Sequence, residues 1–322
     1  MKAAVYHRTG PPEVLQYEDV PDPEVRSGGV LIDVEAVSIE GGDVLNRAGG
    51  MMAGDPHIVG YQCAGTISQV GEKAAADGAA RGQRVVATMA FGSHAEKVSV
   101  PFAATWPVPD GADIVAVACV PVAFGTADDC LFEFGRLEEG ETVLVQAGAG
   151  GVGLAAIQLA KRAGATVLAT ASSDEKLAAL TDFGMDHGIN YRDNDAAEAA
   201  RALTDGRGVD LVVDPVGGST LAASLRALAY RGRCITVGNA SRERQPLDVS
   251  SLMGGNQSLT GVFLGAEIAT PRARAMIAGH IDDVAAGRLR VVVDRTFPLA
   301  EAAAAHEYIE SRQAVGRVVL IP

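Results

Sequence analysis

Long hydrophobic runs and an excess of basic residues are missing from this sequence, and we expect no leader segment. No stretch approaches ~20 uninterrupted apolar residues, the length that a membrane-spanning helix needs, and the residues after Met1 do not resemble a signal peptide. Lysine and arginine number 27 against 40 acidic residues, for a net charge of −13, which argues against nucleic acid or an anionic membrane as the main partner. We therefore expect a cytoplasmic protein.

Cysteines are few and scattered. There are four, with no C-x-x-C or C…H spacing: Cys63, Cys119, Cys130 and Cys234. This distribution fits neither a disulfide framework nor a clustered zinc site. We interpret the cysteines as small buried apolar residues in a reducing compartment.

One stretch rich in glycine, residues 141–164, carries the strongest motif. An apolar run predicts a buried strand, and helical spacing of apolar residues resumes at once behind the glycines. Between them, Gly148, Gly150 and Gly153 fit G-x-G-x-x-G, with Gly151 and Val152 inside it. Glycines between a strand and a helix are typical of dinucleotide binding, since the helix N-terminus offers N–H groups to phosphates. The alternative is a plain glycine-rich connection.

The period of the apolar pattern divides the chain in two. The first ~120 residues read as short strands with no ten-residue helical pattern, which predicts a barrel-like or sandwich-like domain. Residues 114–131 have helical spacing with a break expected at Pro121. Strand and helix signals then alternate, as in a doubly wound parallel sheet. A helix from Pro271, a strand at 291–293 and a final strand at 317–321 complete the pattern.

The end of the second strand of the alternating region bears on the choice of cofactor. NAD-selective versions of this motif carry an acid about 20 residues beyond the glycines, whereas here Ser172 and Ser173 stand there, followed by Lys176. Hydroxyls and an ammonium suit a ribose 2′-phosphate, which favours NADPH over NADH. Alternatively, Ser172 and Glu175 form a capping box and Lys176 is a solvated helix residue.

Several motifs in order resemble one family over nearly the whole chain. They are PHIVGYQCAGTISQVG (56–71), GSHAE (92–96), PVAFGTA (121–127), AGAGGVGLAAIQLAK (147–161), DHGINYR (186–192), VVDPVGG (212–218) and HEYIESRQAVGRVVLIP (306–322). The sequence resembles the zinc-free quinone oxidoreductase group, related to zeta-crystallin, of the medium-chain dehydrogenase/reductase superfamily. The resemblance implies an α/β protein: a GroES-like β-rich catalytic domain of residues 1–120 and 270–322, and a Rossmann doubly wound parallel-sheet domain of residues 121–269, with NADPH in the cleft between them.

The resemblance also implies cofactor contacts at matching positions. Lys176, Tyr191 and Arg312 would hold the 2′-phosphate side of NADPH. The nicotinamide half would be bordered by four further residues: Thr126, Val216, Asn239 and Phe263. On the residues alone, Tyr191 could equally be a packing residue and Arg312 a surface charge.

The positions where zinc-containing relatives of the superfamily carry metal ligands hold other residues here. Ser38 and Tyr61 stand there, with Gln62 where a glutamate is usual, and none of the three is a normal zinc ligand. Without a metal to carry an alkoxide, hydride transfer needs an acceptor that is already electron-poor, such as a quinone or an alkene conjugated to a carbonyl. We therefore predict a metal-independent enzyme.

The substrate pocket departs from the resembled group. Residues 36–43 read AVSIEGGD, with Ser38 for an asparagine and two extra residues. Tyr61 is the leading candidate for a proton donor or a substrate-orienting hydroxyl, although it could equally pack under the nicotinamide. Asn46 is a second candidate, with Glu40 and Asp43 weaker ones. We expect the loops at 38–55 and 240–256 to shape the pocket, and we interpret two histidines as structural: His57 and His94.

The leading hypothesis is an NADPH-dependent reductase of quinones or other α,β-unsaturated carbonyl compounds. An enoyl-thioester or alkenal reductase is the alternative within enzymes, and a non-catalytic NADPH-binding structural or sensor protein is the alternative from another class. The resemblance further suggests a homodimer in which edge strands pair, and the apolar run 258–264 is the expected edge.

Overall fold

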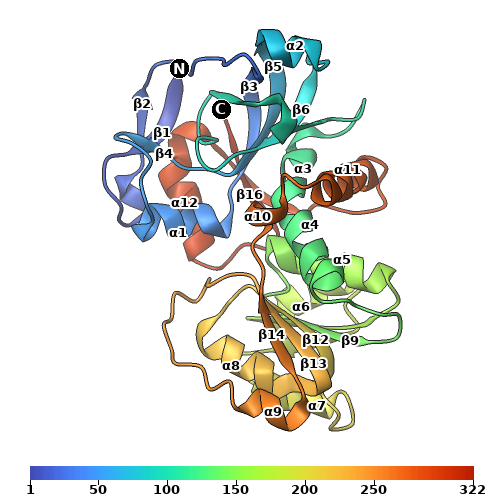
Figure 1. Ribbon diagram of the computed structural model, residues 1–322. Coiled ribbons are helices and arrows are strands. Elements are labelled where there is room, and N and C mark those ends of the chain that lie inside the picture. The colour runs from blue at the N-terminus through green and yellow to red at the C-terminus, as the bar shows by residue number, and fades with distance from the viewer. The chain divides into compact units, whose positions relative to one another are not determined.

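The computed structural model describes all 322 residues of the chain, shown as a ribbon in Figure 1. The chain divides into two compact units, one of Met1–Val122 with Arg274–Pro322 and the other of Ala123–Ala273. These boundaries fall inside two helices, α4 (Val120–Asp128) and α11 (Pro271–Ala285). None of the helices combines the length and the apolar character that crossing a membrane requires.

The first unit is mainly antiparallel. One sheet has the order β15-β16-β3-β5-β6-β8, and β7 also pairs with β3. The strands are β3 (Gly29–Ser38), β5 (Gln62–Val70), β6 (Arg84–Thr88), β7 (Lys97–Pro101), β8 (Thr105–Pro107), β15 (Val293–Pro298) and β16 (Arg317–Ile321). A smaller sheet has the order β2-β1-β4, with β1 (Lys2–Tyr6), β2 (Gln16–Asp19) and β4 (His57–Ile58). Strand β16 runs antiparallel to β3, so the C-terminal segment completes a sheet begun near the N-terminus.

Short helices accompany these sheets. They are α1 (Gly41–Gly49), α2 (Glu72–Ala76), α3 (Ile114–Ala118), α12 (Ala302–Glu310) and the 3₁₀ turns Pro12–Val14, Phe102–Ala104 and Leu299–Glu301. Three sequence predictions were wrong here. The pocket segment at 38–55 contains helix α1, which begins where the backbone N–H of Glu40 donates to Oδ2 of Asp43 at 2.7 Å. The break in 114–131 falls at Cys119, because Pro121 lies in the first turn of α4, where proline is tolerated. The strand expected at 291–293 begins only at Val293.

The second unit is built on a parallel sheet with the order β11-β10-β9-β12-β13-β14. Its strands are β9 (Thr142–Val145), β10 (Thr166–Ala171), β11 (His187–Asn190), β12 (Val209–Asp214), β13 (Leu228–Thr236) and β14 (Ser258–Gly261). Its helices are α5 (Gly151–Arg162), α6 (Asp174–Thr181), α7 (Ala196–Ala202), α8 (Gly218–Ala227), α9 (Ser251–Gly255) and α10 (Leu264–Glu267), with the π-helical turn Asp129–Glu133. The chain order reverses between β9 and β12, which makes that point the switch of a doubly wound sheet. The predicted fold class is confirmed.

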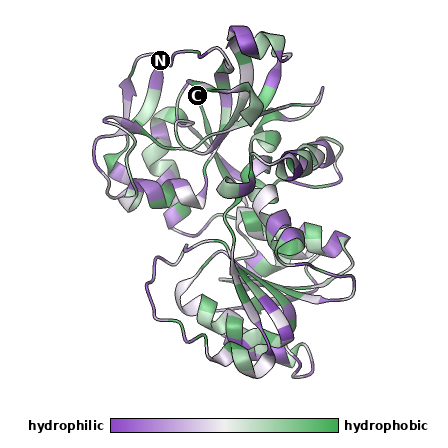
Figure 2. Cartoon of the chain, in the orientation of Figure 1, coloured by the Kyte–Doolittle hydropathy of each residue, from purple (hydrophilic) through white to green (hydrophobic).

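Each unit has its own core. In the second unit every residue of β9 is buried, because a central parallel strand is covered on both faces. In the first unit, apolar residues of β3, β5, β6, β7 and β16 form one cluster with the inner side of α12. Figure 2 shows hydrophobic colour along strands of both units, while hydrophilic residues are mixed into the loops and helices. All four cysteines are free and buried, as predicted.

Candidate functional site

The turn between β9 and α5 is closed by contacts that only glycine allows. A Cβ atom on Gly153 would lie 2.4 Å from the carbonyl oxygen of Ala147, and one on Gly148 would lie 2.9 Å from the Cβ of Ala169. Gly150 differs, since its added Cβ would meet only the Ala147 oxygen, at 3.3 Å. Gly148 and Gly153 therefore close the turn, whereas Gly150 leaves the surface beside it bare.

The N-terminus of α5 presents backbone donors at this bare surface. Gly150 is the N-cap residue, and no side chain caps the helix. The first bond inside the helix runs from the N–H of Leu154 to the oxygen of Gly150, at 2.9 Å. The N–H groups of residues 151–153 precede that bond and have no partner within the helix. The turn therefore fits the pyrophosphate of a dinucleotide, with donors at the helix start and no side chain in the way.

A buried polar chain joins the carboxyl ends of the strands next to this turn. Thr170 donates to Oε1 of Gln146 (2.8 Å), whose amide donates to Ser224 (3.1 Å), and Ser224 donates to Oδ2 of Asp214 (2.9 Å). The other oxygen of Asp214 accepts the backbone N–H groups of residues 216–217, at 2.8 and 2.9 Å. This series of hydrogen bonds was not predicted from the sequence. The signal for it was the polar residues at the ends of apolar strands.

The two serines after β10 have different roles. Ser173 is the N-cap of α6, and its Oγ accepts the N–H of Lys176 at 3.4 Å. The alternative of a capping box formed by Ser172 and Glu175 was therefore wrong, because the helix begins one residue later. The N–H of Tyr191 donates to the carbonyl of Ala171 at 3.1 Å, so Tyr191 and Ser172 lie together at the carboxyl ends of β10 and β11. Lys176 lies in the first turn of α6.

The other predicted cofactor residues lie in different places. Val216 follows β12 and Asn239 follows β13, and the two loops touch, since a Cβ on Gly217 would lie 2.9 Å from Oδ1 of Asn239. Phe263 is the exposed N-cap of α10, after β14. Thr126 is buried in α4. Arg312 belongs to the first unit, in the turn after α12 with a φ of 57°.

In the first unit, a buried arginine lies next to Ser38, one of the positions where zinc-containing relatives carry metal ligands. Arg317, at the start of β16, donates from Nη2 to Oγ of Ser38 at 2.7 Å and to the carbonyl of Ile39 at 2.7 Å. It also forms a short ion pair with Glu40, which accepts the amide of Gln62 at 2.5 Å as well. No group of three or more His, Cys, Asp or Glu side chains is arranged to hold a metal ion.

Tyr61 lies beside this cluster, against the first turn of α1. A Cβ on Gly42 would lie 2.4 Å from Cε2 of the Tyr61 ring and 3.1 Å from its hydroxyl oxygen. Burial, together with the nearby carboxyl groups of Asp43 and Glu40, raises the pKa of Tyr61 to about 12, so its hydroxyl is protonated at neutral pH. Burial also raises the pKa of the Asp43 carboxyl well above its usual value.

Asn46 is occupied by structural contacts. Its Oδ1 accepts the hydroxyl of Tyr6 at 2.6 Å, and its amide donates to the carbonyl of Met51 at 3.3 Å. These two bonds tie α1 to β1 and to the segment that follows the helix. Of the two catalytic candidates, Asn46 therefore has both its side-chain oxygen and its amide engaged within the chain.

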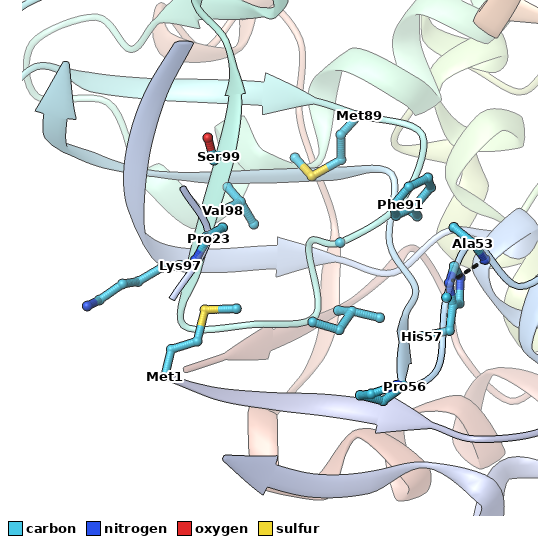
Figure 3. Close-up of a pocket in the computed structure, with 13 residues that line it drawn as sticks. Met1, Pro23, Ala53, Pro56, His57, Met89, Phe91, Lys97, Val98 and Ser99 are labelled. Atoms are coloured by element: carbon cyan, nitrogen blue, oxygen red, sulfur yellow. Dashed lines mark hydrogen bonds between the residues drawn. The ribbon is translucent and has the colours of Figure 1, made fainter. Parts of the chain in front are cut away.

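A cavity of about 290 Å³ lies in the first unit and is lined mainly by apolar residues, together with His57, Lys97 and Ser99 (Figure 3). The backbone N–H of Ala53 donates to Nδ1 of His57 at 3.1 Å. Nδ1 is thus an acceptor, so the proton of the neutral ring is on Nε2, which has no partner. Burial lowers the pKa of His57, which keeps the ring neutral. Phe91 lies against the ring at a centroid distance of 5.5 Å.

His94, the other histidine interpreted as structural, forms a buried pair that the sequence did not indicate. Its Nε2 lies 3.0 Å from Nε2 of His306 in α12. Both rings are fully buried, and neither Nδ1 has a hydrogen-bond partner. Burial lowers the pKa of His94 to about 3. Burial, with His94 and Arg47 nearby, also lowers the pKa of His306 well below its usual value. The pair therefore shares one hydrogen bond between two neutral rings.

Known proteins match both units. Residues 26–110 match the alcohol dehydrogenase GroES-like domain, and residues 151–279 match the zinc-binding dehydrogenase family. A 2-haloacrylate reductase of Burkholderia sp is 33% identical, over 99% of this chain and 98% of that protein. A quinone oxidoreductase of Pseudomonas aeruginosa is 33% identical over 97% of both chains. A mycobacterial protein solved in complex with NADPH has a TM-score of 0.94 at 36% identity and full coverage of both chains.

Longer proteins match as well. A highly reducing polyketide synthase of Arthrinium phaeospermum is 34% identical over 72% of this chain, which spans only 10% of that protein.

A GroES-like unit joined to a parallel sheet with a glycine turn at its switch point defines an oxidoreductase of the medium-chain dehydrogenase/reductase type. Within that superfamily, the chain belongs to the zinc-free quinone oxidoreductase group. The family predicted from the motifs is thereby confirmed.

Proposed function

We propose that this protein is an NADPH-dependent, metal-independent reductase that transfers a hydride to a quinone or another α,β-unsaturated carbonyl compound. The observation that carries the proposal is the environment of Ser38 and Gln62. Ser38 accepts a hydrogen bond from Arg317, Gln62 donates one to Glu40, and Arg317 and Glu40 form an ion pair. These side chains are engaged with one another and leave no place for a metal ion. The relatives named quinone oxidoreductase and 2-haloacrylate reductase act on acceptors of this electron-poor kind.

Bound NADPH supplies the hydride, and the chain's own residues hold the cofactor and the acceptor. The N–H groups at the start of α5 bind the pyrophosphate, and the loops held by Asp214 and Asn239 border the nicotinamide half. We propose that Ser172, Lys176 and Tyr191 of the second unit bind the 2′-phosphate. The protonated hydroxyl of Tyr61 donates a hydrogen bond to the carbonyl oxygen of the acceptor, where negative charge grows as the hydride arrives.

The test is the loss of NADPH absorbance with a panel of acceptors: a 1,4-quinone, a cyclic enone, an alkenal, a 2-haloacrylate and a crotonyl thioester. We expect turnover on a quinone or an enone, unchanged by a chelator and slower with NADH. NADPH binding without turnover on any of the five would contradict the proposal and favour a non-catalytic role.

An enoyl-thioester reductase is the second candidate. The match to a highly reducing polyketide synthase over 72% of this chain favours it. The crotonyl thioester arm of the panel separates the two candidates. Turnover confined to that arm would replace the quinone and enone proposal with this one.

The adjacent serines after β10 allow a test of cofactor choice. Ser172→Asp places a carboxylate where the 2′-phosphate is proposed to bind, so the ratio of NADPH to NADH affinity is expected to fall by a factor on the order of 100. The measurement is the dissociation constant of each nucleotide by fluorescence titration.

Ser173→Ala is the matched control for that test. It removes the N-cap oxygen of α6 and is expected to cost about 1 kcal/mol of stability without changing the nucleotide ratio. An unchanged ratio in Ser172→Asp, or an equal change in both variants, would remove Ser172 from the cofactor site.

We further propose a homodimer formed through β14. This strand ends the six-stranded sheet and pairs only with β13, so its outer edge is available for pairing. The free cysteines fit the reducing cytoplasm as its location. Sedimentation as a monomer at micromolar concentration would contradict the dimer.

A further inference from the structure

The side chain of Tyr61 is packed against residues that have no role of their own in the proposed function. The first of these is Gly42. The Tyr61 ring lies where a side chain on Gly42 would have to be, with Cε2 only 2.4 Å from the position of an added Cβ. Real Cβ contacts are never that short. The ring can therefore lie against α1 only because residue 42 is glycine.

The backbone on both sides of Tyr61 is also held. Gly60 has a φ of 120°, and a Cβ there would lie 1.9 Å from Oγ of Ser93. The carbonyl of Tyr61 itself accepts the N–H of Met89 at 2.9 Å. The side chain of Gln62 donates to Glu40 at 2.5 Å and accepts the N–H of Val122 at 3.0 Å. These contacts restrict the position of the Tyr61 backbone.

The first turn of α1, against which the Tyr61 ring lies, is itself held by hydrogen bonds and an ion pair. Glu40 directly precedes α1 and is bound by the buried Arg317 of β16. The N–H of Glu40 donates to Asp43 at 2.7 Å, which closes the first turn of the helix. A guanidinium from the C-terminal strand therefore fixes the turn on which the Tyr61 ring rests.

We propose that Gly42, together with the Gln62–Glu40–Arg317 chain, is a positioning device that aims the Tyr61 hydroxyl at the carbonyl oxygen of the acceptor. This inference rests on the role of Tyr61 in the proposed function. The inference predicts different effects of a side chain at the two neighbouring glycines, Gly41 and Gly42. A Cβ on Gly41 meets nothing within 4 Å, whereas one on Gly42 must displace the ring. Displacements of about 1 Å at a reacting group cost on the order of 100-fold in rate.

The test compares Gly42→Ala, Gly41→Ala, Tyr61→Phe and the double variant Gly42→Ala/Tyr61→Phe. For turnover of an enone with NADPH, we expect Gly42→Ala to lower kcat/KM by about 10- to 100-fold and Gly41→Ala to leave it unchanged. The double variant should be no slower than Tyr61→Phe, within a factor of about two, because a misplaced ring has no hydroxyl left to lose. NADPH affinity should be the same in all four.

Each other outcome has a definite meaning. Full activity in Gly42→Ala, equal losses in Gly41→Ala and Gly42→Ala, or a double variant whose loss is the product of the single losses would overturn the inference. Full activity in Tyr61→Phe would instead show that Tyr61 has no part in the proposed mechanism. A wild-type protein that is inactive on every acceptor would contradict the proposed function itself.

A second variant covers the case in which Gly42→Ala does not fold. Gln62→Asn shortens the side chain by one methylene, so its amide cannot reach both Glu40 and the N–H of Val122. It should lower kcat/KM by about 10-fold and show the same lack of additivity with Tyr61→Phe. Additive losses would again overturn the inference.

Discussion

A Gly150→Ala variant is expected to fold like the wild type and to bind NADPH about 100-fold more weakly, a loss of about 3 kcal/mol. The added methyl meets only the Ala147 oxygen at 3.3 Å, so the turn accommodates it with a small shift. It then stands at the start of α5, where the pyrophosphate is proposed to approach the backbone. Fluorescence titration with NADPH measures the affinity, and thermal unfolding monitors the fold.

Gly254 provides the matched control in the same unit. It lies in α9, and a Cβ there meets nothing within 4 Å. Gly254→Ala should leave the NADPH affinity at the wild-type value and should not lower the unfolding midpoint. Wild-type NADPH affinity in Gly150→Ala would show that the cofactor does not use this turn.

Acid is expected to destabilise the protein through the buried pair of His94 and His306. The pKa of each ring is lower in the folded chain than the usual 6.5, with His94 at about 3. The unfolded state therefore binds more protons, so stability is complete above pH 6.5 and is lost as the pH falls from there towards 3. Each ring costs about 1.4 kcal/mol per pH unit. Lowering the pH from 6.5 to 5 should reduce the free energy of unfolding by about 3 kcal/mol, measured by urea denaturation.

His306→Gln separates the pair from the carboxylates, which also titrate in acid. A glutamine amide can still bond to His94 but takes up no proton. The pH dependence between 6.5 and 5 should therefore fall to about half of the wild-type slope. The same slope in this variant and in the wild type would assign the acid lability to other groups.

The glycine turn of the second unit was predictable because its signals are local. A strand, a glycine turn and a helix follow one another within 24 residues, 141–164, and each leaves its own pattern. Conformation at Gly148 and Gly153 depends on atoms of the same turn or of the next strand. The position of the N-cap, by contrast, was missed by one residue, since Ser172 and Ser173 have equal propensity and only the end of β10 decides between them.

The site of the first unit could not be predicted to the same depth, since its contacts join residues far apart in the chain. Arg317 bonds to Ser38 across 279 positions, and His94 to His306 across 212. Helix α1 was missed because the two glycines at its start, Gly41 and Gly42, suggest a loop. Its start depends on Glu40 and Asp43, whose buried positions are set by β16 and β5.

The sequence alone determined the family, the doubly wound sheet, the glycine turn and the absence of ordinary zinc ligands at positions 38 and 61. These features follow from residue type and spacing along one segment, so no folding is needed to read them. Only the tertiary structure decided which serine caps α6, that Asn46 is committed to Tyr6, and that Tyr61 lies against Gly42, next to a turn that an arginine of the last strand holds. Those contacts depend on side chains brought together by the sheets, and burial then sets which of them hold a proton.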